Sequence, residues 1–563
     1  MESEHGLYLT LCKPLEETKY QESLSSLSVC GEGEKYGDEK LRFALVSLLA
    51  SGVKRISHIN HEPKESWGVV LEHSRRPDGD TLDRYLEALI ELDEEEREEG
   101  EKSVEERWGC IRENGRIAQA QQESLRNWAE AGLLEDEVWR FDGHTIEYYG
   151  EGKIGKTKHG TKEKSVKAVD RYTLYNGICG LTEYFPTCIS YDEALRKMVI
   201  KAQEALPEEH RIRKLCFDKE GWKGETLLWL WQEHQVAALV WVKNTSTNVK
   251  ILNQIEEDAF VRVPEQLMLG KGEKTQVVRV ADTTVELPAL GSSRVVVLET
   301  TQARRIAIYT AAPHPRDVSL HDSYAISTIQ LLEGLRLQQH VENSFKVDVH
   351  EMGTDALPMH KLLTCQQAEP YPLEEAQTKL QNAHKLVDKY TRQLQEHIPD
   401  LQEHPQLDKD DINLLTKRAS RLQQNALDKI DTLSQEIDST VIDEQGQPLQ
   451  ISTRQFLDLR KLTLFNLFKA HASVALIMLA QLLGWDGAGP QRLRQAFLSF
   501  GHRVVFDHRL RIATVYPTQF PSARTQVAYE RLCSHLHDTP LTLKRQGIEY
   551  QLRFHWDSSN YKM

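Results

Sequence analysis

The sequence of 563 residues lacks several features that mark whole classes of protein. It has eight cysteines but no Cys-x-x-Cys pair, which argues against a zinc ribbon and against a thioredoxin-like redox motif. Several cysteines lie inside apolar runs, so we expect buried free thiols and a reducing, cytoplasmic compartment. The first residues do not combine a basic segment with an apolar one, and we therefore expect no signal peptide.

The chain also lacks a long uninterrupted apolar run and an excess of basic residues. Its most apolar stretch, about 462–483, contains Asn466, Lys469, His471 and Gln481, which favours a buried helix over a membrane span. The 70 Lys and Arg are outnumbered by 85 Asp and Glu, for a net charge of -15. This net charge does not indicate a nucleic-acid-binding protein, but a local basic surface can bind phosphates within an acidic protein.

What is present is the composition of a soluble globular protein, with 40% hydrophobic and 28% charged residues, long enough for about three or four domains. Residues 1–130 have helical periodicity, and we leave open whether they form a DNA-gripping helix-turn-helix module or a helical packing domain. Residues 131–360 have an α/β pattern, interrupted at about 246–311 by an all-β insertion. Residues 361–450 predict a helical hairpin, and residues 451–563 a mixed helical and strand region.

Within the α/β region, early strands form a meander and later strands alternate with helices. This order predicts a layered α/β fold with a mixed sheet. We expect strands at 138–142, 165–175, 181–190, 213–218 and 236–242, and helices at 192–205 and 225–233. In the insertion we expect strands at 261–263, 275–280, 284–287, 293–299 and 305–309. Further helices are predicted at 319–346, 453–483 and 490–500, and C-terminal strands at 503–506, 511–516 and 550–554.

Two aspartates end strands of similar sequence. Asp142 follows Trp-Arg-Phe, and Asp218 follows Leu-Cys-Phe. A single aspartate at a strand end is usually a turn or cap, whereas two in matched contexts favour a shared site. Carboxylates brought together repel each other unless a cation neutralises them, and Mg²⁺ prefers such oxygen ligands. The residues therefore predict a divalent-metal site suited to phosphoryl transfer.

Three segments carry a resemblance to a known family. Residues 141–150, Phe-Asp-Gly-His-Thr-Ile-Glu-Tyr-Tyr-Gly, resemble the first-acid strand of DDE transposases from bacterial and archaeal insertion sequences. Residues 217–222 resemble the family's second-acid segment, and residues 341–346, Val-Glu-Asn-Ser-Phe-Lys, its third-acid helix. The likeness covers about 130–360, and it places the β-rich insertion between the second and third acids, as in one branch of the family.

The resemblance implies an RNase H-like catalytic core and a triad of Asp142, Asp218 and Glu342. These three would bind two Mg²⁺ ions, with Mn²⁺ as a substitute. The activity implied is Mg²⁺-dependent phosphodiester hydrolysis and strand transfer at transposon ends. The partners implied are double-stranded transposon-end and target DNA, with a homodimer on DNA, in the cytoplasm at the nucleoid.

Other residues receive supporting roles through the same resemblance. His144 and Asn343 would support the metal ligands, and Lys346 would meet a DNA phosphate. Glu333 lies nine residues before Glu342 on the same predicted helix and stays open as an alternative third acid. The chain departs from a related branch at residues 335 and 338, where leucine and glutamine stand in place of tyrosine and arginine.

A lysine-rich segment follows the first acid. It is read either as a solvated loop or as a clamp for DNA phosphates, with Lys156 and Lys158 as the candidate contacts. The lysines are Lys153, Lys156, Lys158, Lys162, Lys164 and Lys167.

The same segment contains a competing motif. Residues 150–157 match the P-loop pattern G-x-x-x-x-G-K-T. A P-loop must open a helix whose N-terminus faces the phosphates, and residues 158–164 have no apolar stripe. We interpret the match as a coincidence. Three functions therefore remain as alternatives. The first is an active transposase, which the intact acids favour. The others are a catalytically inactive or domesticated DNA-binding protein of the same fold and a P-loop nucleotide-binding protein.

Overall fold

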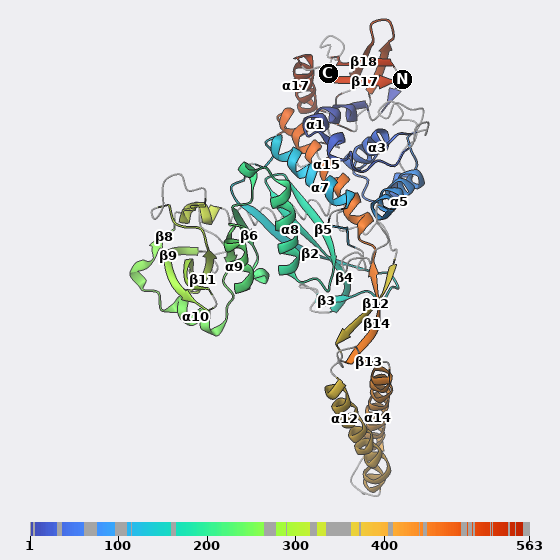
Figure 1. The fold of residues 1–563 in the computed structure, drawn as a ribbon, viewed down its shortest axis with the longest axis vertical. Helices are drawn as coiled ribbons and strands as arrows, with labels where there is room; N and C mark the ends of the chain where they lie inside the picture. The colour runs from blue at the N-terminus through green and yellow to red at the C-terminus, as the bar shows by residue number, and fades with distance from the viewer. Residues whose placement is uncertain are drawn as a thin grey trace. The chain divides into compact units, whose positions relative to one another are not determined.

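A computed structural model gives the fold of the chain (Figure 1). It divides into two compact units, one of residues 1–151, 155–361 and 457–563, and one of residues 152–154 and 362–456. The structure describes all residues except 1, 4–5, 31–35, 61–75, 96–109, 114, 135, 159–164, 264–276, 289, 316–323, 334–361, 371–372, 403–408, 439, 443–447, 486–492, 494–497, 499–501, 518–519, 521, 539–540, 546–547 and 556–563.

The centre of the larger unit is a ten-stranded mixed sheet. Five of its strands run in the order β5–β4–β2–β6–β7, in which β2, β4 and β5 are antiparallel neighbours and β6 and β7 follow parallel to β2. A short strand, β3, pairs with the start of β4. The α/β class and the mixed sheet predicted from the strand order are confirmed. The bounds are β2 Trp139–Glu147, β3 Lys156–Lys158, β4 Ser165–Asn176, β5 Cys179–Pro186, β6 Lys214–Phe217 and β7 Ala237–Trp241.

Helices α8 (Tyr191–Ala205) and α9 (Gly224–Gln232) follow strands of this sheet and bury their apolar sides in one core with it. α8 starts where it does because the Ser190 side chain caps it, accepting a hydrogen bond from the Glu193 N–H. Its buried residues recur every three or four positions, as helix packing requires. The same core includes Phe141 of β2 and Phe217 of β6, which therefore face these helices.

The insertion extends the central sheet. β11 pairs antiparallel with β7, and β10, β9 and β8 continue outward from it. Two expectations were wrong here. The insertion is not all-β, because Thr245 caps a helix, α10. The strands expected at 275–280 and 284–287 are one strand, because residues 281–283 stay paired with β10. The bounds are α10 Ser246–Asn253, β8 Val261–Arg262, β9 Val277–Leu287, β10 Gly291–Thr300 and β11 Arg305–Thr310.

The N-terminal helices and the C-terminal segment share one hydrophobic core. The long helix α15 runs between them and contacts α1, α3 and α5. α15 is long and apolar enough to cross a membrane by composition alone, but 78% of its most apolar window is buried inside the fold. The bounds are η1 Gly6–Leu11, α1 Cys12–Glu17, α2 Tyr20–Ser23, α3 Asp38–Ala50, α4 Ile56–Ile59, α5 Gly79–Glu95, α7 Arg116–Glu130 and α15 Arg460–Leu482.

A second sheet closes this part of the unit, in the order β1–β15–β16–β18–β17. β16 and β18 are parallel, and the other neighbours are antiparallel. Helix α17 covers it through Tyr529, whose hydroxyl donates to the Val515 carbonyl. The bounds are β1 Glu2–Ser3, β15 His502–Asp507, β16 Ile512–Pro517, α17 Ala523–Asp538, β17 Leu541–Arg545 and β18 Ile548–Phe554.

One predicted helix begins later than its periodicity indicated. The helix expected from residue 453 begins at Arg460, because the chain up to Leu457 forms strand β14. Of the helix expected at 319–346, the described residues 324–327 are not helical and residues 328–333 are; the rest lies outside the described residues. Most of the helix expected at 490–500 lies outside the described residues.

The smaller unit is a three-stranded sheet, β12–β14–β13, that carries a helical hairpin of α12 and α14. Ile412, Ala419, Ala426 and Leu433 of α14 recur at seven-residue intervals, and all are buried. Such a heptad is typical of a coiled-coil seam, and alanine in it permits close approach of the helices. The bounds are β12 Leu362–Pro370, α12 Leu373–Arg392, a π-helix Gln393–His397, α13 Ile398–Gln402, α14 Lys409–Asp438, β13 Thr440–Ile442 and β14 Pro448–Leu457.

Candidate active site

The structure places Asp142 and Asp218 beside each other. The parallel ladder between β2 and β6 ends at the pair Phe141 and Phe217, and the next residue of each chain is an aspartate. Neighbouring strands lie about 4.8 Å apart, so the two carboxylates start from adjacent backbones. The backbone of Asp218 is still extended, with ψ 163°. Because strand side chains alternate and both phenylalanines face the α8 core, both aspartates leave from the opposite face of the sheet.

One detail of the expectation was wrong: Asp142 does not end its strand. β2 continues to Glu147, because its other edge stays paired with β4 throughout. Asp142 instead marks the point where β2 loses its partner β6. The carboxylate is therefore only half-buried, although it sits within a long strand.

Both carboxylates are fixed by their own backbones. The Oδ1 atom of Asp142 accepts from the Gly143 N–H at 2.8 Å, and the Oδ1 atom of Asp218 accepts from the Lys219 N–H at 2.7 Å. Gly143 is required here, because a Cβ atom would lie 2.7 Å from the ring of Tyr172 on β4. These contacts orient the carboxylates and leave oxygen lone pairs available for a cation.

Tyr191, the first residue of α8, reaches the same point from the other face of the sheet. Its hydroxyl donates to the Phe141 carbonyl at 3.3 Å. Burial raises the pKa of this phenol well above its usual value, and the negative charge of Asp142 adds to the rise. Asp218 has two opposite effects on the pKa of Tyr191: its carboxylate raises this pKa, and its backbone N–H lowers it. The hydroxyl thus lies close to both aspartates.

Sequence reasoning missed two further acids in this region, Glu220 and Asp170. Asp170 pairs with Thr145 and therefore lies on the α8 face of the sheet, opposite the face of the two aspartates. Burial raises the pKa of Asp170 on β4, although the Thr145 hydroxyl bonds it, and the charge of Glu220 raises it further. Glu220 follows Asp218 by two residues, a proximity that the sequence could have signalled. In the described part of the chain, however, no three His, Cys, Asp or Glu side chains gather as a metal site. Asp142 and Asp218 are therefore a pair there, not a triad.

An open cavity of about 690 Å³ adjoins Asp218 at the ends of β6 and β7. Its wall combines two lysines, an amide and an indole with the carboxylate, groups that can contact the phosphates and bases of a nucleic-acid strand. The lining residues are Asp218, Lys219, Glu220, Trp241, Val242, Lys243, Asn244 and Ile306.

The expected third acid, Glu342, lies outside the described residues, as do Asn343 and Lys346. The described start of their predicted helix, residues 328–333, buries Leu331 and Leu332 in one core with Cys216 of β6. Cys216 and Asp218 lie on the same face of the strand, so this helix begins on the face of the two aspartates. Glu333 is exposed and forms no three-acid group with them.

An ion pair anchors the start of that helix. Arg294 of β10 makes two hydrogen bonds to Asp282 of β9, at 2.9 and 2.6 Å. The same guanidinium donates to the Ile326 carbonyl, and the Thr328 hydroxyl donates to Asp282. Burial opposes ionisation of Asp282, but the bonds from Arg294 and Thr328 outweigh it and lower its pKa. The insertion therefore fixes where the helix begins.

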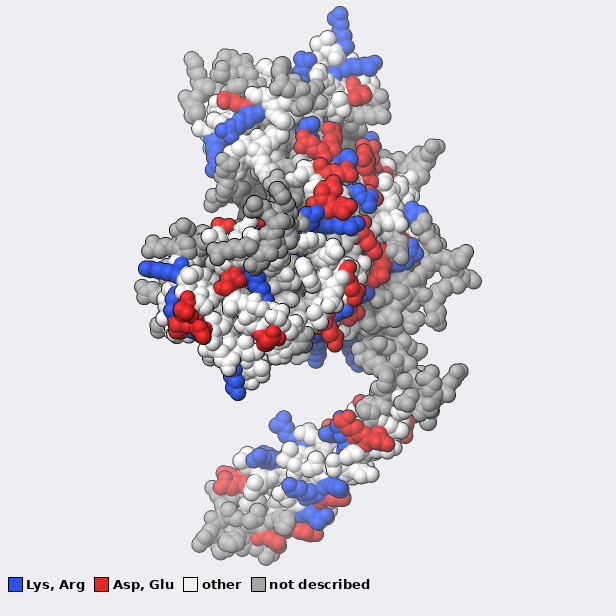
Figure 2. All heavy atoms as spheres, turned by 60° about the vertical axis from the view of Figure 1, so that its left-hand side comes forward, with Lys and Arg blue, Asp and Glu red and all other residues white. Residues whose placement is uncertain are grey.

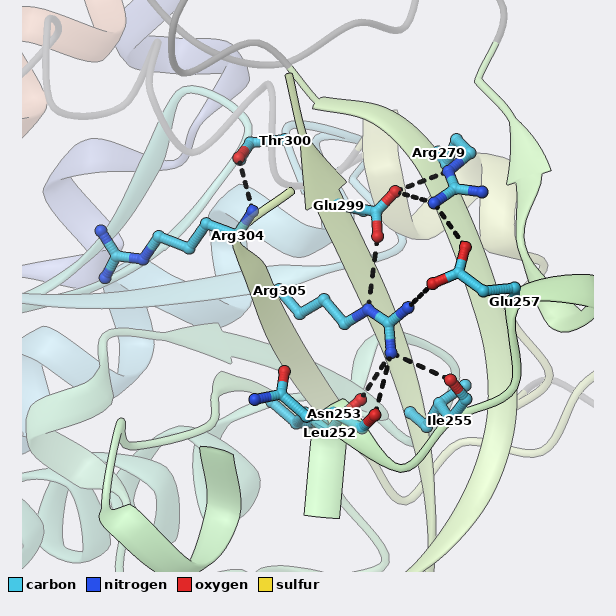
Figure 3. Close-up of polar contacts among 9 residues, drawn as sticks. All are labelled: Leu252, Asn253, Ile255, Glu257, Arg279, Glu299, Thr300, Arg304 and Arg305. Carbon is cyan, nitrogen blue, oxygen red and sulfur yellow. Dashed lines mark hydrogen bonds and ion pairs between the residues drawn. The ribbon is translucent and has the colours of Figure 1, made fainter. Parts of the chain in front are cut away.

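Within the insertion, a larger network holds strands β9, β10 and β11 to the end of helix α10 (Figure 3). Glu299 of β10, which is buried, accepts hydrogen bonds from Arg279 and Arg305. Both arginines also bond Glu257, and Arg305 donates to backbone carbonyls at the end of α10, including that of Ile255 at 2.9 Å. The two guanidiniums lie over the ring of Phe260. Every charge in this group has a partner, so we assign it to structure.

The predicted DNA-contacting lysines are placed in part. Lys156 is exposed on β3, directly opposite Lys167 of β4. The Lys167 ammonium donates to the backbone carbonyls of residues 150 and 151, which fixes the preceding loop. Lys158 ends β3, and its side chain lies outside the described set. His144 is exposed on β2, two residues beyond Asp142 and opposite Arg171.

The P-loop interpretation is wrong. The loop at 150–155 leads into strand β3, which pairs with β4. The element after a P-loop must be a helix, because its N-terminal N–H groups face the phosphates.

Comparisons with known proteins add little to this geometry. No protein-family model matches the sequence, and no curated protein matches it. Among solved structures, the chain is similar to a piggyBac transposase in a synaptic complex with hairpin DNA. The two are 10% identical, with a TM-score of 0.30, over 60% of this chain and 68% of that chain. A likeness of this size assigns no role to any residue.

Proposed function

We propose that the protein is a DNA transposase of the DDE type, of the kind found in bacterial and archaeal insertion sequences. The observation that carries the proposal is the parallel pairing of β2 and β6, which brings Asp142 and Asp218 side by side. The surrounding order β5–β4–β2–β6–β7, with a meander followed by two parallel strands, supports an RNase H-like core.

The donor set suits a hard divalent cation. Two carboxylates on adjacent strands, with Glu220 lining the same cavity as Asp218, concentrate negative charge that a cation would neutralise. Carboxylate oxygens are the ligands that Mg²⁺ prefers, and Mn²⁺ accepts the same set. Asp142 and Asp218 would hold the metal, and the resemblance adds Glu342 as the third ligand. When bound, two such ions lower the pKa of a water or 3′-hydroxyl and stabilise charge on phosphoryl oxygens.

The chain's own residues would position the DNA. Lys219 and Lys243 line the cavity beside Asp218 and would contact the phosphates of the strand being cut. Lys156, Lys158 and Lys346 would contact phosphates farther along the duplex. The partners proposed are transposon ends and target DNA, bound by a homodimer in the cytoplasm at the nucleoid.

Figure 2 shows why binding should be confined to particular surfaces. On the face of the larger unit drawn there, acidic side chains gather in a band, with basic side chains beside and among them. A polyanion is repelled by such a face, so DNA contact must depend on local lysines and on metal.

The test is cleavage of labelled DNA that carries the element's terminal repeats, in Mg²⁺ or Mn²⁺. We expect wild-type protein to cut at the repeat ends. Asp142→Asn, Asp218→Asn and Glu342→Gln should bind the same DNA without cutting it. Glu233→Gln, which changes an exposed acid after α9, is the matched control and should cut normally. Cutting by the two aspartate variants at the wild-type rate would refute the proposed metal site. Binding of the DNA without cutting by wild-type protein would instead indicate a DNA-binding protein without catalysis.

A further inference from the structure

Tyr191 joins the two strands that carry the aspartates. The last ladder pair between β2 and β6 is Phe141 with Phe217. One step beyond it, the Tyr191 hydroxyl donates to the Phe141 carbonyl at 3.3 Å, and the backbone N–H of Asp218 lies close enough to lower the pKa of this phenol. The hydroxyl oxygen therefore lies between the two backbones, next to the residues that carry the carboxylates.

The ring of Tyr191 has little freedom to move. It meets Phe141 edge-on, with ring centroids 5.1 Å apart, and Tyr172 edge-on at 5.7 Å. Such edge-to-face contacts are favourable geometries for aromatic pairs. The third side is closed by the turn after Asp218, because a Cβ atom on Gly221 would lie 2.9 Å from Cε1 of Tyr191. The hydroxyl is thus presented to the two backbones by a ring that is held on several sides.

The Tyr191 hydroxyl lies where the two aspartate-bearing chains diverge. Asp142 continues along a strand that β4 holds, whereas Asp218 leaves its strand for the turn Lys219–Gly221. On the Asp218 side, the carboxylate accepts from the Lys219 N–H as the turn begins. Small cations bind at 2.0–2.1 Å in strict geometry, so a change in carboxylate spacing changes affinity.

Resting on the proposed metal site, we propose that Tyr191 is a positioning residue whose hydroxyl sets the separation of Asp142 and Asp218 and thereby the affinity of the pair for a small divalent cation. The residues on either side of Tyr191 are engaged elsewhere, since Ser190 caps the helix and Asp192 pairs with Lys223.

The experiment uses Tyr191→Phe, which removes the hydroxyl and keeps the ring. Tyr172→Phe is the matched control, because it removes a hydroxyl from the neighbouring ring, which has no bond to either strand backbone among those described. Two quantities are measured on full-length protein without DNA. One is Mn²⁺ affinity, from the free-ion signal in electron paramagnetic resonance. The other is amide hydrogen exchange in a peptide containing Asp218, measured without metal.

We expect Tyr191→Phe to weaken Mn²⁺ binding by about 10- to 100-fold, the usual effect of losing a group that orients a metal ligand. Exchange at Asp218 should accelerate, while Tyr172→Phe should match wild type in both measurements. Wild-type Mn²⁺ affinity in Tyr191→Phe overturns the proposal, even where Asp142→Asn and Asp218→Asn abolish binding. Unchanged exchange at Asp218 overturns it too. Failure of the proposed function looks different, because wild-type protein itself would then bind no Mn²⁺ that depends on the aspartates.

Discussion

Phe141 and Phe217 are register partners at the end of a parallel ladder, and each is followed by an aspartate. The phenylalanines bury their rings toward α8, so the aspartates face the other side of the sheet together. Two carboxylates held this way repel each other in the absence of a cation.

That repulsion gives a prediction about stability. Without metal, Asp142→Asn should raise the thermal midpoint of the larger unit slightly, because it removes one of two like charges. Added Mg²⁺ or Mn²⁺ should stabilise wild type by mass action and leave the variant unchanged. Differential scanning calorimetry with and without metal measures both effects. A variant that is stabilised by metal as strongly as wild type contradicts the assignment of Asp142 as a ligand.

The network in Figure 3 predicts a large difference between two adjacent arginines. Arg305 is 9% exposed and bonds Glu299 and Glu257, whereas the side chain of Arg304 points away from both acids. Arg305→Met would leave Glu299 buried with fewer partners, at a cost of about 3 kcal/mol. Arg304→Met should change stability by less than about 0.5 kcal/mol. Urea unfolding of the two variants makes the comparison. Equal effects would mean that the network does not stabilise the insertion.

His471 predicts loss of stability in acid. This residue of α15 is fully buried against Tyr20 and Trp128, and burial lowers its pKa to about 3. The folded pKa is below the unfolded value of about 6.5, so the neutral ring contributes stability that is complete above pH 6.5 and lost as the pH falls toward 3. Near pH 4.5 the protonation of His471 in the unfolded state should have lowered the free energy of unfolding by about 3 kcal/mol.

The check for His471 is the pH dependence of unfolding. His471→Met removes the titrating ring and should flatten the decline between pH 6.5 and 4.5 by about that amount. His210→Met, at a histidine that is only half-buried, should keep the wild-type slope. If the slope of His471→Met equals that of wild type, the ring is not responsible for the acid sensitivity.

At the seam of the helical hairpin, we expect a larger side chain to lower the stability of the smaller unit. Ala419 of α14 is 6% exposed and packs in one cluster with Leu394 and Ile398, so Ala419→Leu should force these segments apart and destabilise the hairpin by about 1–3 kcal/mol. Leu414, which is 67% exposed on the same helix, is the control, and Leu414→Ala should be nearly neutral. Hydrogen exchange within residues 409–438 reports on this unit directly. Faster exchange in both variants alike would argue against the heptad seam.

Sequence periodicity found the elements whose side chains alternate cleanly, and missed those defined by distant partners. The apolar runs before Asp142 and Asp218 predicted their strands, and matched context predicted that they act together. Nothing local showed that residues 281–283 stay in one strand, because β10 holds them there. Helix α10 could have been found from its cap at Thr245. Tyr191 could not, because its role depends on three chain segments meeting at one oxygen.

Because β11 is hydrogen-bonded to β7, the insertion is a continuation of the central sheet and not a tethered module. Cutting it out would turn β7 into a bare edge strand, whose unpaired N–H and C=O groups invite pairing with another chain. A shortened protein built by deleting residues 246–311 should therefore aggregate even though it keeps Asp142 and Asp218.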